Sequence, residues 1–298
     1  MTDNAFWLDI AGLTLAVTAD ADLPIAADGS ARKFVTGDPA RTPGARAPFV
    51  SLHARWGDPR VPRDAAVAFD SGKGLWRLYR TADGPQIVFT SPALGPDAYQ
   101  AAAFSEDFRQ GVVTMRRAPF AARLPVYPLH YPLDELLMVH LLSRGLGVEV
   151  HAAGVVLPDG RGWLFVGVSG AGKSTLSRLW RAEPDANVLS DERIVLRREA
   201  GALRMYGTPW HGDGQIAEPG SARLDRIFFL RHGARNGLAP VPLTDAISRL
   251  FVCGFTPFHD AAGLDFSLGF LETVARECPG QQLSFVPDRS AVAFLRGA

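Results

Sequence analysis

Short runs in which apolar and polar residues alternate dominate the first third of the chain. They lie at residues 6–19, 48–56, 65–71, 74–81, 85–91 and 111–117. A period of two is typical of half-buried β-strands. Two of the intervening segments, 37–48 and 58–64, contain several prolines, which disfavours helix. The pattern therefore predicts a mostly β domain over residues 1–125, and substrate recognition is a natural role for it.

The pattern changes at residues 132–145, PLDELLMVHLLSRG, which is apolar nearly all round. Asp134 and Glu135 stand where the positive end of a helix would lie, and Gly145 provides a stop, so the segment predicts a buried helix. His140 shares a face with leucines, which favours a packed core histidine over a ligand.

A second domain is predicted over residues 126–298, in which strands and helices mix. Strands are expected at 148–157, 163–168, 193–198, 203–210, 226–233, 283–287 and 291–295, and helices at 174–182, 243–254 and 263–278. The expected fold class is therefore α/β, with the mostly β domain in front.

Composition narrows the class of protein. The 298 residues carry 31 basic and 31 acidic side chains, for a formal net charge of zero, which argues against a nucleic-acid partner held by bulk electrostatics. Cys253 and Cys278 each lack a CxxC partner, so neither a disulfide framework nor a thiolate metal site is expected. The chain has no signal-like leader, and no run approaches the ~18 apolar residues of a membrane span. We therefore expect a cytoplasmic protein without a membrane span.

The segment GVSGAGKST at 167–175 follows an apolar run and precedes a predicted helix. It satisfies the pattern G-x-x-x-x-G-K-[ST] in the structural context that this motif requires. In such a loop, backbone N–H groups and the positive helix end face phosphate oxygens. Lys173 would reach the β- and γ-phosphates of ATP, and the Ser174 hydroxyl would hold Mg²⁺. The predicted nucleotide-binding positions are Gly167, Ser169, Gly170, Ala171, Gly172, Lys173, Ser174 and Thr175.

A histidine is expected near this loop. The runs at 148–157 and 163–168 are separated by PDGRG, whose turn residues predict an antiparallel hairpin. With the turn centred near residues 159 and 160, paired residues sum to about 319, so His151 would lie opposite Val168. The alternative is a histidine that merely begins a strand.

Two adjacent acids, Asp191 and Glu192, follow the apolar residues Val188 and Leu189. If this strand runs parallel to the one before the loop, both end at the same edge of the sheet. Carboxylates there can hold Mg²⁺ or accept a proton from an attacking hydroxyl. Arg193, beside the acids, is a candidate for neutralising the transferred charge.

A second hairpin is predicted around Gly201, with pair sums near 401, which places Trp210 opposite Asp191 and His211 beside it. Both hairpins therefore direct polar residues toward the loop. The glycine-rich stretch at 207–214 could close over a ligand, and a purely structural turn is an equal alternative.

The segment HAAGVVLPDGRGWLFVGVSGAGKSTLSRLW, followed by VLSDER, resembles the catalytic domain of HPr kinase/phosphorylase and its HPr-kinase-like relatives, whose P-loop fold is shared with phosphoenolpyruvate carboxykinase. The resemblance covers roughly residues 130–296. The stretches GTPWHGDG and LSFVPD also resemble the branch found beside peptide-modification and export genes, including the kinases of lasso-peptide clusters.

The resemblance implies ATP- and Mg²⁺-dependent phosphorylation of a serine in a protein or peptide. It implies Asp191 as the general base, His151 as a helper near the phosphates, and self-association into a homo-oligomer. Two features depart from the family. Glu192 stands where the family usually has aspartate, and the glycine-rich signature that follows the acids in HPr kinases is missing. The resemblance therefore does not extend to HPr itself as substrate, nor to the reverse phosphorylase reaction.

The leading hypothesis is a kinase that transfers the γ-phosphate of ATP to a serine or threonine hydroxyl of a small protein or peptide, with Asp191, His151 and Lys173 as catalytic residues. Ser174, Asp191 and Glu192 are the expected Mg²⁺ ligands. Two alternatives remain open at this point: a carboxykinase-like kinase of a small metabolite, and a module that binds ATP without transferring phosphate. An ATP-driven transport subunit is disfavoured, because no LSGGQ-like signature follows the loop.

Overall fold

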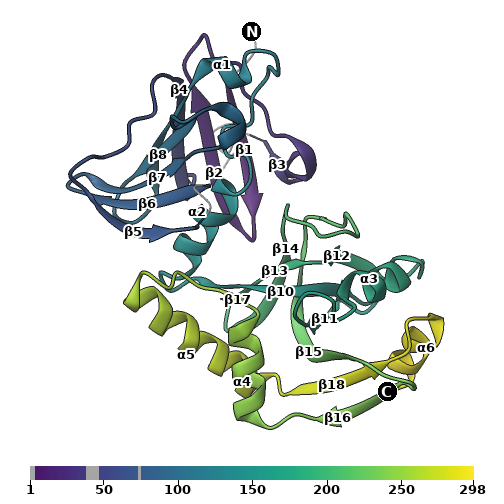
Figure 1. Ribbon diagram of the computed structural model, residues 1–298. Helices are drawn as coiled ribbons and strands as arrows, with labels where there is room; N and C mark the ends of the chain where they lie inside the picture. The colour runs from purple at the N-terminus through teal and green to yellow at the C-terminus, as the bar shows by residue number, and fades with distance from the viewer. Residues whose placement is uncertain (1–3, 38–46, 73–74) are drawn as a thin grey trace. The chain divides into compact units, whose positions relative to one another are not determined.

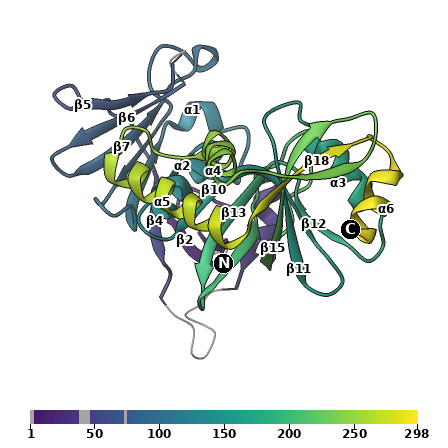
Figure 2. The same cartoon turned by 90° about the horizontal axis from the view of Figure 1, so that it is seen from below.

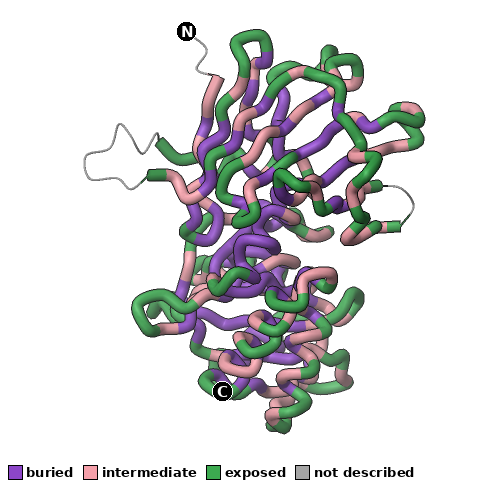
Figure 3. Tube along the Cα trace, turned by 90° about the vertical axis from the view of Figure 1, so that its left-hand side faces the viewer, coloured by how far each residue is buried: buried purple, intermediate pink, exposed green. Residues whose placement is uncertain are grey.

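The computed structural model describes residues 4–37, 47–72 and 75–298. The chain divides into two compact units, Met1–Leu141 and Leu142–Ala298. Residues 126–141 thus group with the N-terminal unit, whereas the sequence had grouped them with the second domain. Figure 3 shows that buried positions follow the strands, while exposed positions gather in the turns. Among the described residues, no helix combines the length and apolarity needed to cross a membrane.

The N-terminal unit is built on one mixed sheet (Figure 1), and it is mostly β, as the alternating pattern predicted. Its strands are β1 (Ala5–Ile10), β2 (Leu13–Ala19), β3 (Val35–Thr36), β4 (Val50–Trp56), β5 (Ala66–Asp70), β6 (Trp76–Thr81), β7 (Gly84–Phe89), β8 (Gln100–Phe104) and β9 (Gln110–Met115). They pair in the order β3-β1-β2-β4-β9-β8-β7-β6-β5. β8 was missed, because its sequence QAAAF does not alternate. Most of the proline-rich stretch 37–48 lies outside the described residues.

The helical segments that accompany this sheet in the described part of the chain are η1 (Gly29–Phe34), η3 (Pro92–Leu94), α1 (Arg117–Phe120) and α2 (Leu133–Leu142). The predicted helix at 132–145 is α2. His140 on this helix is buried, stacks on Phe108 with ring centroids 4.4 Å apart, and places Nδ1 2.6 Å from the Leu136 carbonyl oxygen. The prediction of a packed core histidine is confirmed.

The C-terminal unit also combines a mixed sheet with helices, so the mixed α/β class is confirmed. Its strands are β10 (Gly147–Val156), β11 (Arg161–Val166), β12 (Asn187–Ser190), β13 (Arg193–Glu199), β14 (Ala202–Gly207), β15 (Ser221–His232), β16 (Gly237–Pro240), β17 (Gly254–Phe255) and β18 (Gly280–Phe285). β15 pairs with β14 through its first residues and in parallel with β11 along most of its length. The strands β11, β10, β13, β14 and β15 therefore form a closed circuit.

Helices cover both faces of this sheet (Figures 1 and 2). They are α3 (Lys173–Arg181), α4 (Leu243–Val252), α5 (Ala261–Glu277) and α6 (Arg289–Gly297). Successive residues of β11 explain the layering. Leu164 and Val166 join a core with α4 and α5, whereas Trp163 and Phe165 join a core with α3 and α6. A strand stretch buried on both faces needs apolar residues at successive positions, as residues 163–166 of β11 have.

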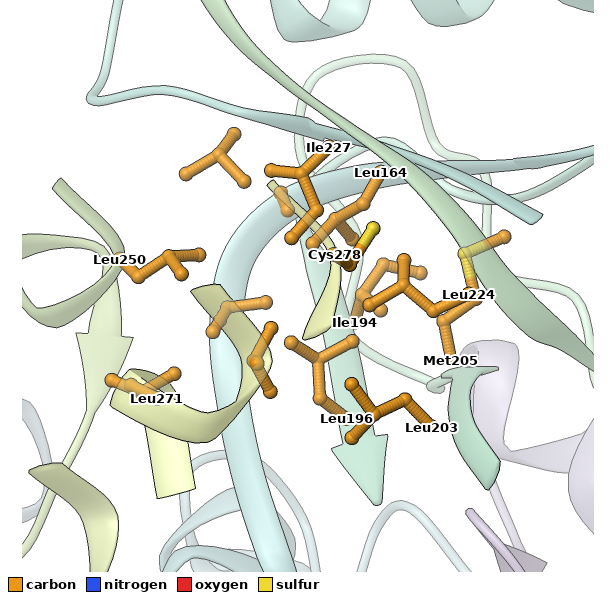
Figure 4. Packing of buried hydrophobic residues seen from close by; sticks show 14 of the residues in the cluster. Leu164, Ile194, Leu196, Leu203, Met205, Leu224, Ile227, Leu250, Leu271 and Cys278 are labelled. Atoms are coloured by element: carbon orange, nitrogen blue, oxygen red, sulfur yellow. The ribbon is translucent and has the colours of Figure 1, made fainter. Parts of the chain in front are cut away.

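Figure 4 shows how the first of these cores is filled. Leu164, Ile194, Met205 and Leu224 come from four strands of the closed circuit, and Leu250 and Leu271 come from the two helices. Cys278 packs in the same cluster, and Cys253 and Cys278 are both free and buried. This packing fixes the C-terminal ends of β11 and β15, from which the candidate site is built.

Two local predictions need correction. The β10–β11 hairpin forms, but Ala152 pairs with Val166, so the register is one residue from the predicted one, and its extension sets Gly167 opposite His151. The cause is the turn: Gly160 has a φ of +81°, which centres a three-residue connection on Asp159. The second hairpin has the predicted register, with Ile194 opposite Gly207.

The predicted strand at 291–295 is wrong, because these residues belong to α6. The Asp288 side chain accepts a hydrogen bond from the Ser290 N–H, as an N-cap residue does. Ala291, Val292 and Leu295 are the buried residues, and this spacing is helical. A five-residue apolar run does not distinguish a strand from one face of a short helix.

Candidate functional site

The loop at 167–175 connects the end of β11 to the start of α3, as the motif requires. Gly170 and Gly172 have φ angles of +80° and +100°, in the left-handed region where side chains are strained. At Gly172 space is also lacking, because an added Cβ would lie 2.6 Å from Cζ of Phe285. The backbone path of the loop therefore depends on these two glycines.

Lys173 is the first residue of α3, and its side chain folds back across the loop. The Nζ atom donates hydrogen bonds to the carbonyl oxygens of Gly167, at 2.7 Å, and Val168, at 3.2 Å. The residue is 6% exposed. Burial lowers the pKa of the ammonium group, which nearby acids partly offset. The loop thus holds a cation at the positive end of a helix, an arrangement suited to an anion.

A polar cavity of about 380 Å³ lies against the loop. It is lined by His151, Ser169, Gly170, Gly172, Lys173, Ser174, Thr175, Asp191, Glu192, Gly212, Asp213 and His232. The structure therefore brings together the predicted histidine, both predicted acids and most of the predicted loop positions. Gly167 and Ala171 instead line a mostly apolar cavity of about 320 Å³ beside α4. Arg193, Trp210 and His211 line neither.

Asp191 follows β12 and is fully buried. Its Oδ1 accepts hydrogen bonds from the N–H groups of Gly212, at 3.1 Å, and Ile216, at 3.3 Å. Its Oδ2 accepts one from the Gly214 N–H, at 2.7 Å. Three backbone donors compensate the buried carboxylate, which is the condition for burying such a charge. The sequence placed Trp210 and His211 beside this acid, but the residues that contact it are the next ones along.

Glu192 is the more accessible acid, with a side chain 28% exposed. Its Oε1 lies 2.9 Å from Nη1 of Arg193 and 3.4 Å from Nε2 of His151. Arg193 also places Nε 3.4 Å from a carboxylate oxygen of the buried Glu149, and its guanidinium lies 4.3 Å from the ring centroid of Phe255. Arg193 was expected to neutralise transferred charge, whereas here its guanidinium contacts two carboxylates.

The environment of His151 keeps its ring neutral. Burial is the main cause, followed by the positive charges of Lys173 and Arg193; together they lower the pKa of His151 to about 4, although Glu192 opposes the shift. At neutral pH the ring therefore acts as a hydrogen-bonding group rather than a second cation. His151 lies on β10, and its backbone N–H donates a hydrogen bond to the Cys253 carbonyl oxygen at 2.7 Å, which links this strand to the residue before β17.

His232, the last residue of β15, was not anticipated. Its Nε2 lies 2.9 Å from the Gly170 carbonyl oxygen, and its ring stacks on Phe285 with centroids 5.9 Å apart. The sequence held a signal for it, because β15 is the parallel neighbour of β11 and parallel strands end at the same edge. The argument that placed the acids at the edge where parallel strands end also applies to β15, and it would have indicated His232.

Among residues 4–37, 47–72 and 75–298, no group of three or more histidine, cysteine, aspartate or glutamate side chains is arranged to hold a metal ion. Mg²⁺ at phosphate sites commonly takes one or two carboxylates and completes its shell with water and phosphate oxygens. The Ser174 hydroxyl and the Glu192 carboxylate line the same cavity and are oxygen donors of that kind. These residues therefore fit a magnesium–phosphate ligand better than a metal alone.

The N-terminal unit carries an open trough of about 500 Å³ over β2, β4, β8 and β9. His53 lines it, with Nδ1 3.0 Å from Thr18 Oγ1 and Nε2 2.9 Å from Asp20 Oδ1. Its lining also includes the small residues Ala16, Ser51, Ala103, Ser105 and Gly111.

No model of a known protein family matches the chain, and no curated protein matches it.

Proposed function

We propose that this protein is an ATP-dependent phosphotransferase of the HPr-kinase-like type that phosphorylates a serine or threonine hydroxyl of a small protein or peptide. One observation carries the proposal. The loop, with its buried lysine at the start of α3, and the acids that follow β12 line the same cavity of about 380 Å³. Phosphoryl transfer needs a positively polarised cradle for the phosphates and oxygen ligands for a metal within reach of it.

The use of lysine in this chain supports the same function. Lysine occurs at only three positions, 33, 73 and 173, so arginine supplies nearly all of the 31 basic side chains. Lys173 ends in a compact ammonium group that donates to two loop carbonyls in a buried position. A planar guanidinium has a different donor geometry and does not replace an ammonium in such a space. One of the three lysines of the chain therefore stands in the loop, at the position where an ammonium group would contact phosphates.

The cavity residues would have separate roles. The loop N–H groups and Lys173 would hold the phosphates, and Ser174 with Glu192 would hold Mg²⁺. A bound magnesium ion neutralises phosphate charge and orients the transferring group. In the reaction, the acceptor oxygen bonds to the γ-phosphorus, the bond to the ADP oxygen breaks, and the hydroxyl proton passes to a carboxylate. The neutral ring of His151 would add a hydrogen bond without a second positive charge.

The experiment is to incubate the protein with ATP, Mg²⁺ and the small proteins or peptides encoded beside its gene, and to read mass and modified residue by mass spectrometry. A serine or threonine that gains phosphate supports the proposal. Phosphate found only on a metabolite would favour the metabolite kinase, and nucleotide binding without transfer would favour the binding module.

Lys173→Met is the matched negative variant for this assay, and Lys33→Met is its control. Lys33 is an exposed lysine of η1 in the other unit. Transfer must disappear in the first variant and persist in the second, because only Lys173 lines the cavity.

A further inference from the structure

The segment 208–216, which we call the strap, follows β14 and forms one wall of the cavity. Its residues alternate in exposure around Asp213: His211, Asp213 and Gln215 are exposed, whereas Gly212 and Gly214 are half-buried. The two glycines lie against the acids, and Asp213 lines the cavity.

The glycines are required for space. An added Cβ at Gly214 would lie 2.5 Å from Oδ2 of Asp191, and one at Gly212 would lie 2.6 Å from Oε2 of Glu192. Neither glycine has a φ in the left-handed region. Because real Cβ atoms do not approach oxygen so closely, any side chain at Gly214 must displace either the strap or the Asp191 carboxylate.

Asp191 is the main attachment of the strap. Its two carboxylate oxygens accept hydrogen bonds from three strap N–H groups, and its own side chain is fully buried. Other hydrogen bonds also attach the strap. The Thr208 hydroxyl donates to the Arg193 carbonyl oxygen at 2.8 Å, Arg178 of α3 donates to the Asp213 carbonyl oxygen at 3.3 Å, and the Asp191 N–H donates to the Ile216 carbonyl oxygen at 3.4 Å. Glu192, by contrast, has its carboxylate at the cavity and accepts no strap N–H among the contacts described.

We propose that Asp191 is a positioning residue, which holds the strap as the wall of the acceptor site, and that Glu192 is the acid that faces the bound substrates. This inference rests on the proposed function, since it assigns roles within the same site. It also replaces the expectation that Asp191 acts directly on the acceptor hydroxyl.

The test compares two routes to a loose strap. Asp191→Asn removes the carboxylate, and Gly214→Ala displaces the strap without altering an acid. Both variants should exchange the backbone amide hydrogens of 212–216 at least about tenfold faster than wild type, as local opening does. Both should raise the KM for the acceptor about tenfold while kcat stays within about threefold, because a loosened wall weakens acceptor binding. The double variant should be no worse than the worse single variant.

Two controls accompany these variants. Glu192→Gln should leave amide exchange of the strap unchanged and lower kcat rather than raise KM. Gly237→Ala is the matched glycine control, because an added Cβ there meets no atom within 4 Å. The magnesium complex of AMP-PNP, titrated by calorimetry, should bind Asp191→Asn and Gly214→Ala within about threefold of the wild-type affinity, since the phosphate loop is intact.

Two results would overturn the inference: loss of kcat in Asp191→Asn with unchanged strap exchange, or effects of the two substitutions that multiply in the double variant. Failure of the proposed function looks different, because wild type would then transfer no phosphate to any acceptor. The exchange comparison needs no ligand, so it would still decide whether Asp191 holds the strap.

Discussion

Two glycine-rich segments enclose the candidate cavity, and they need glycine for different reasons. In the loop at 167–175, Gly170 and Gly172 adopt positive φ angles that side chains avoid. In the strap at 208–216, Gly212 and Gly214 have no positive φ, but carboxylate oxygens occupy the place of a side chain. The first requirement is conformational and local, whereas the second is spatial and depends on residues about twenty positions away.

The loop and the strap, which are the two walls of the cavity, therefore use their backbone N–H groups differently. In the loop, Lys173 donates to a backbone carbonyl oxygen, and the proposed function gives the loop N–H groups a phosphate as their partner. The strap presents three N–H groups to an anion of the protein itself, the carboxylate of Asp191. The loop N–H groups are therefore the ones proposed to bind a ligand, whereas three strap N–H groups are already bound to the carboxylate of Asp191.

The largest effect expected is that of Lys173→Met, because it removes the only lysine or arginine among the cavity-lining residues described. Transfer should fall roughly 10³-fold, about 4 kcal/mol of transition-state stabilisation, as expected for loss of a charged donor to the phosphates. Radiolabel transfer from ATP measures it. Amide exchange of the strap should not change, and a faster exchange there would mean that the two walls are coupled.

Next in size is Gly172→Ala, where the conformational and the spatial requirements coincide. The positive φ costs roughly 1–2 kcal/mol and the overlap with Phe285 roughly 1–3 kcal/mol, so the unfolding free energy should fall by about 3 kcal/mol. Urea denaturation measures the loss. A loss below about 1 kcal/mol would show that the loop has another path available, and that its φ angles are not required.

The pH dependence of stability tests whether the two walls keep water from His151. The folded pKa is about 4, because burial and then Lys173 and Arg193 disfavour the imidazolium, whereas an unfolded histidine titrates near 6.5. Below pH 6.5 the unfolded chain gains a proton that the folded chain does not, so stability falls as pH drops from about 6.5 toward 4. Between pH 7.5 and pH 5 this residue should account for about 2 kcal/mol.

The measurement is urea denaturation in metal-free buffer at both pH values, with His151→Gln as the reference that lacks this group. Wild type should lose about 2 kcal/mol more than the variant over that range. Equal losses would mean that the ring is solvated and that the loop and strap do not exclude water from it.

The comparison of the two segments also shows how far sequence reasoning reaches. The loop could be predicted, because its glycines, lysine and serine obey a local spacing between a strand and a helix. The positions of Asp191 and Glu192 could be predicted as well, because they follow a strand that runs parallel to β11, and parallel strands end at the same edge of a sheet. The strap was predicted only as a glycine-rich stretch that could close over a ligand. Its attachment to Asp191 could not be predicted, because the need for Gly214 arises from Asp191 and no local rule links the two.

The fold follows the same division. Alternating runs predicted the N-terminal sheet, and helical spacing predicted α3, α4 and α5. The errors lie where local signals are weak: the alanine-rich β8, the five apolar residues that belong to α6, and a turn centre that moved the β10–β11 register by one residue. His232 was missed although its strand was predicted, because the order of strands in the sheet decides which strand ends meet at the site.

The smallest effect expected separates conformation from space within the loop. Gly170 has a φ of +80°, yet an added Cβ meets nothing within 4 Å, so Gly170→Ala tests the backbone requirement alone. The unfolding free energy should fall by about 1 kcal/mol, the cost of one alanine in the left-handed region. Gly237→Ala, at an open site with no positive φ, should change it by less than about 0.5 kcal/mol. If both variants lose the same amount, the positive φ of the loop carries no penalty, and glycine at 170 serves the ligand rather than the fold.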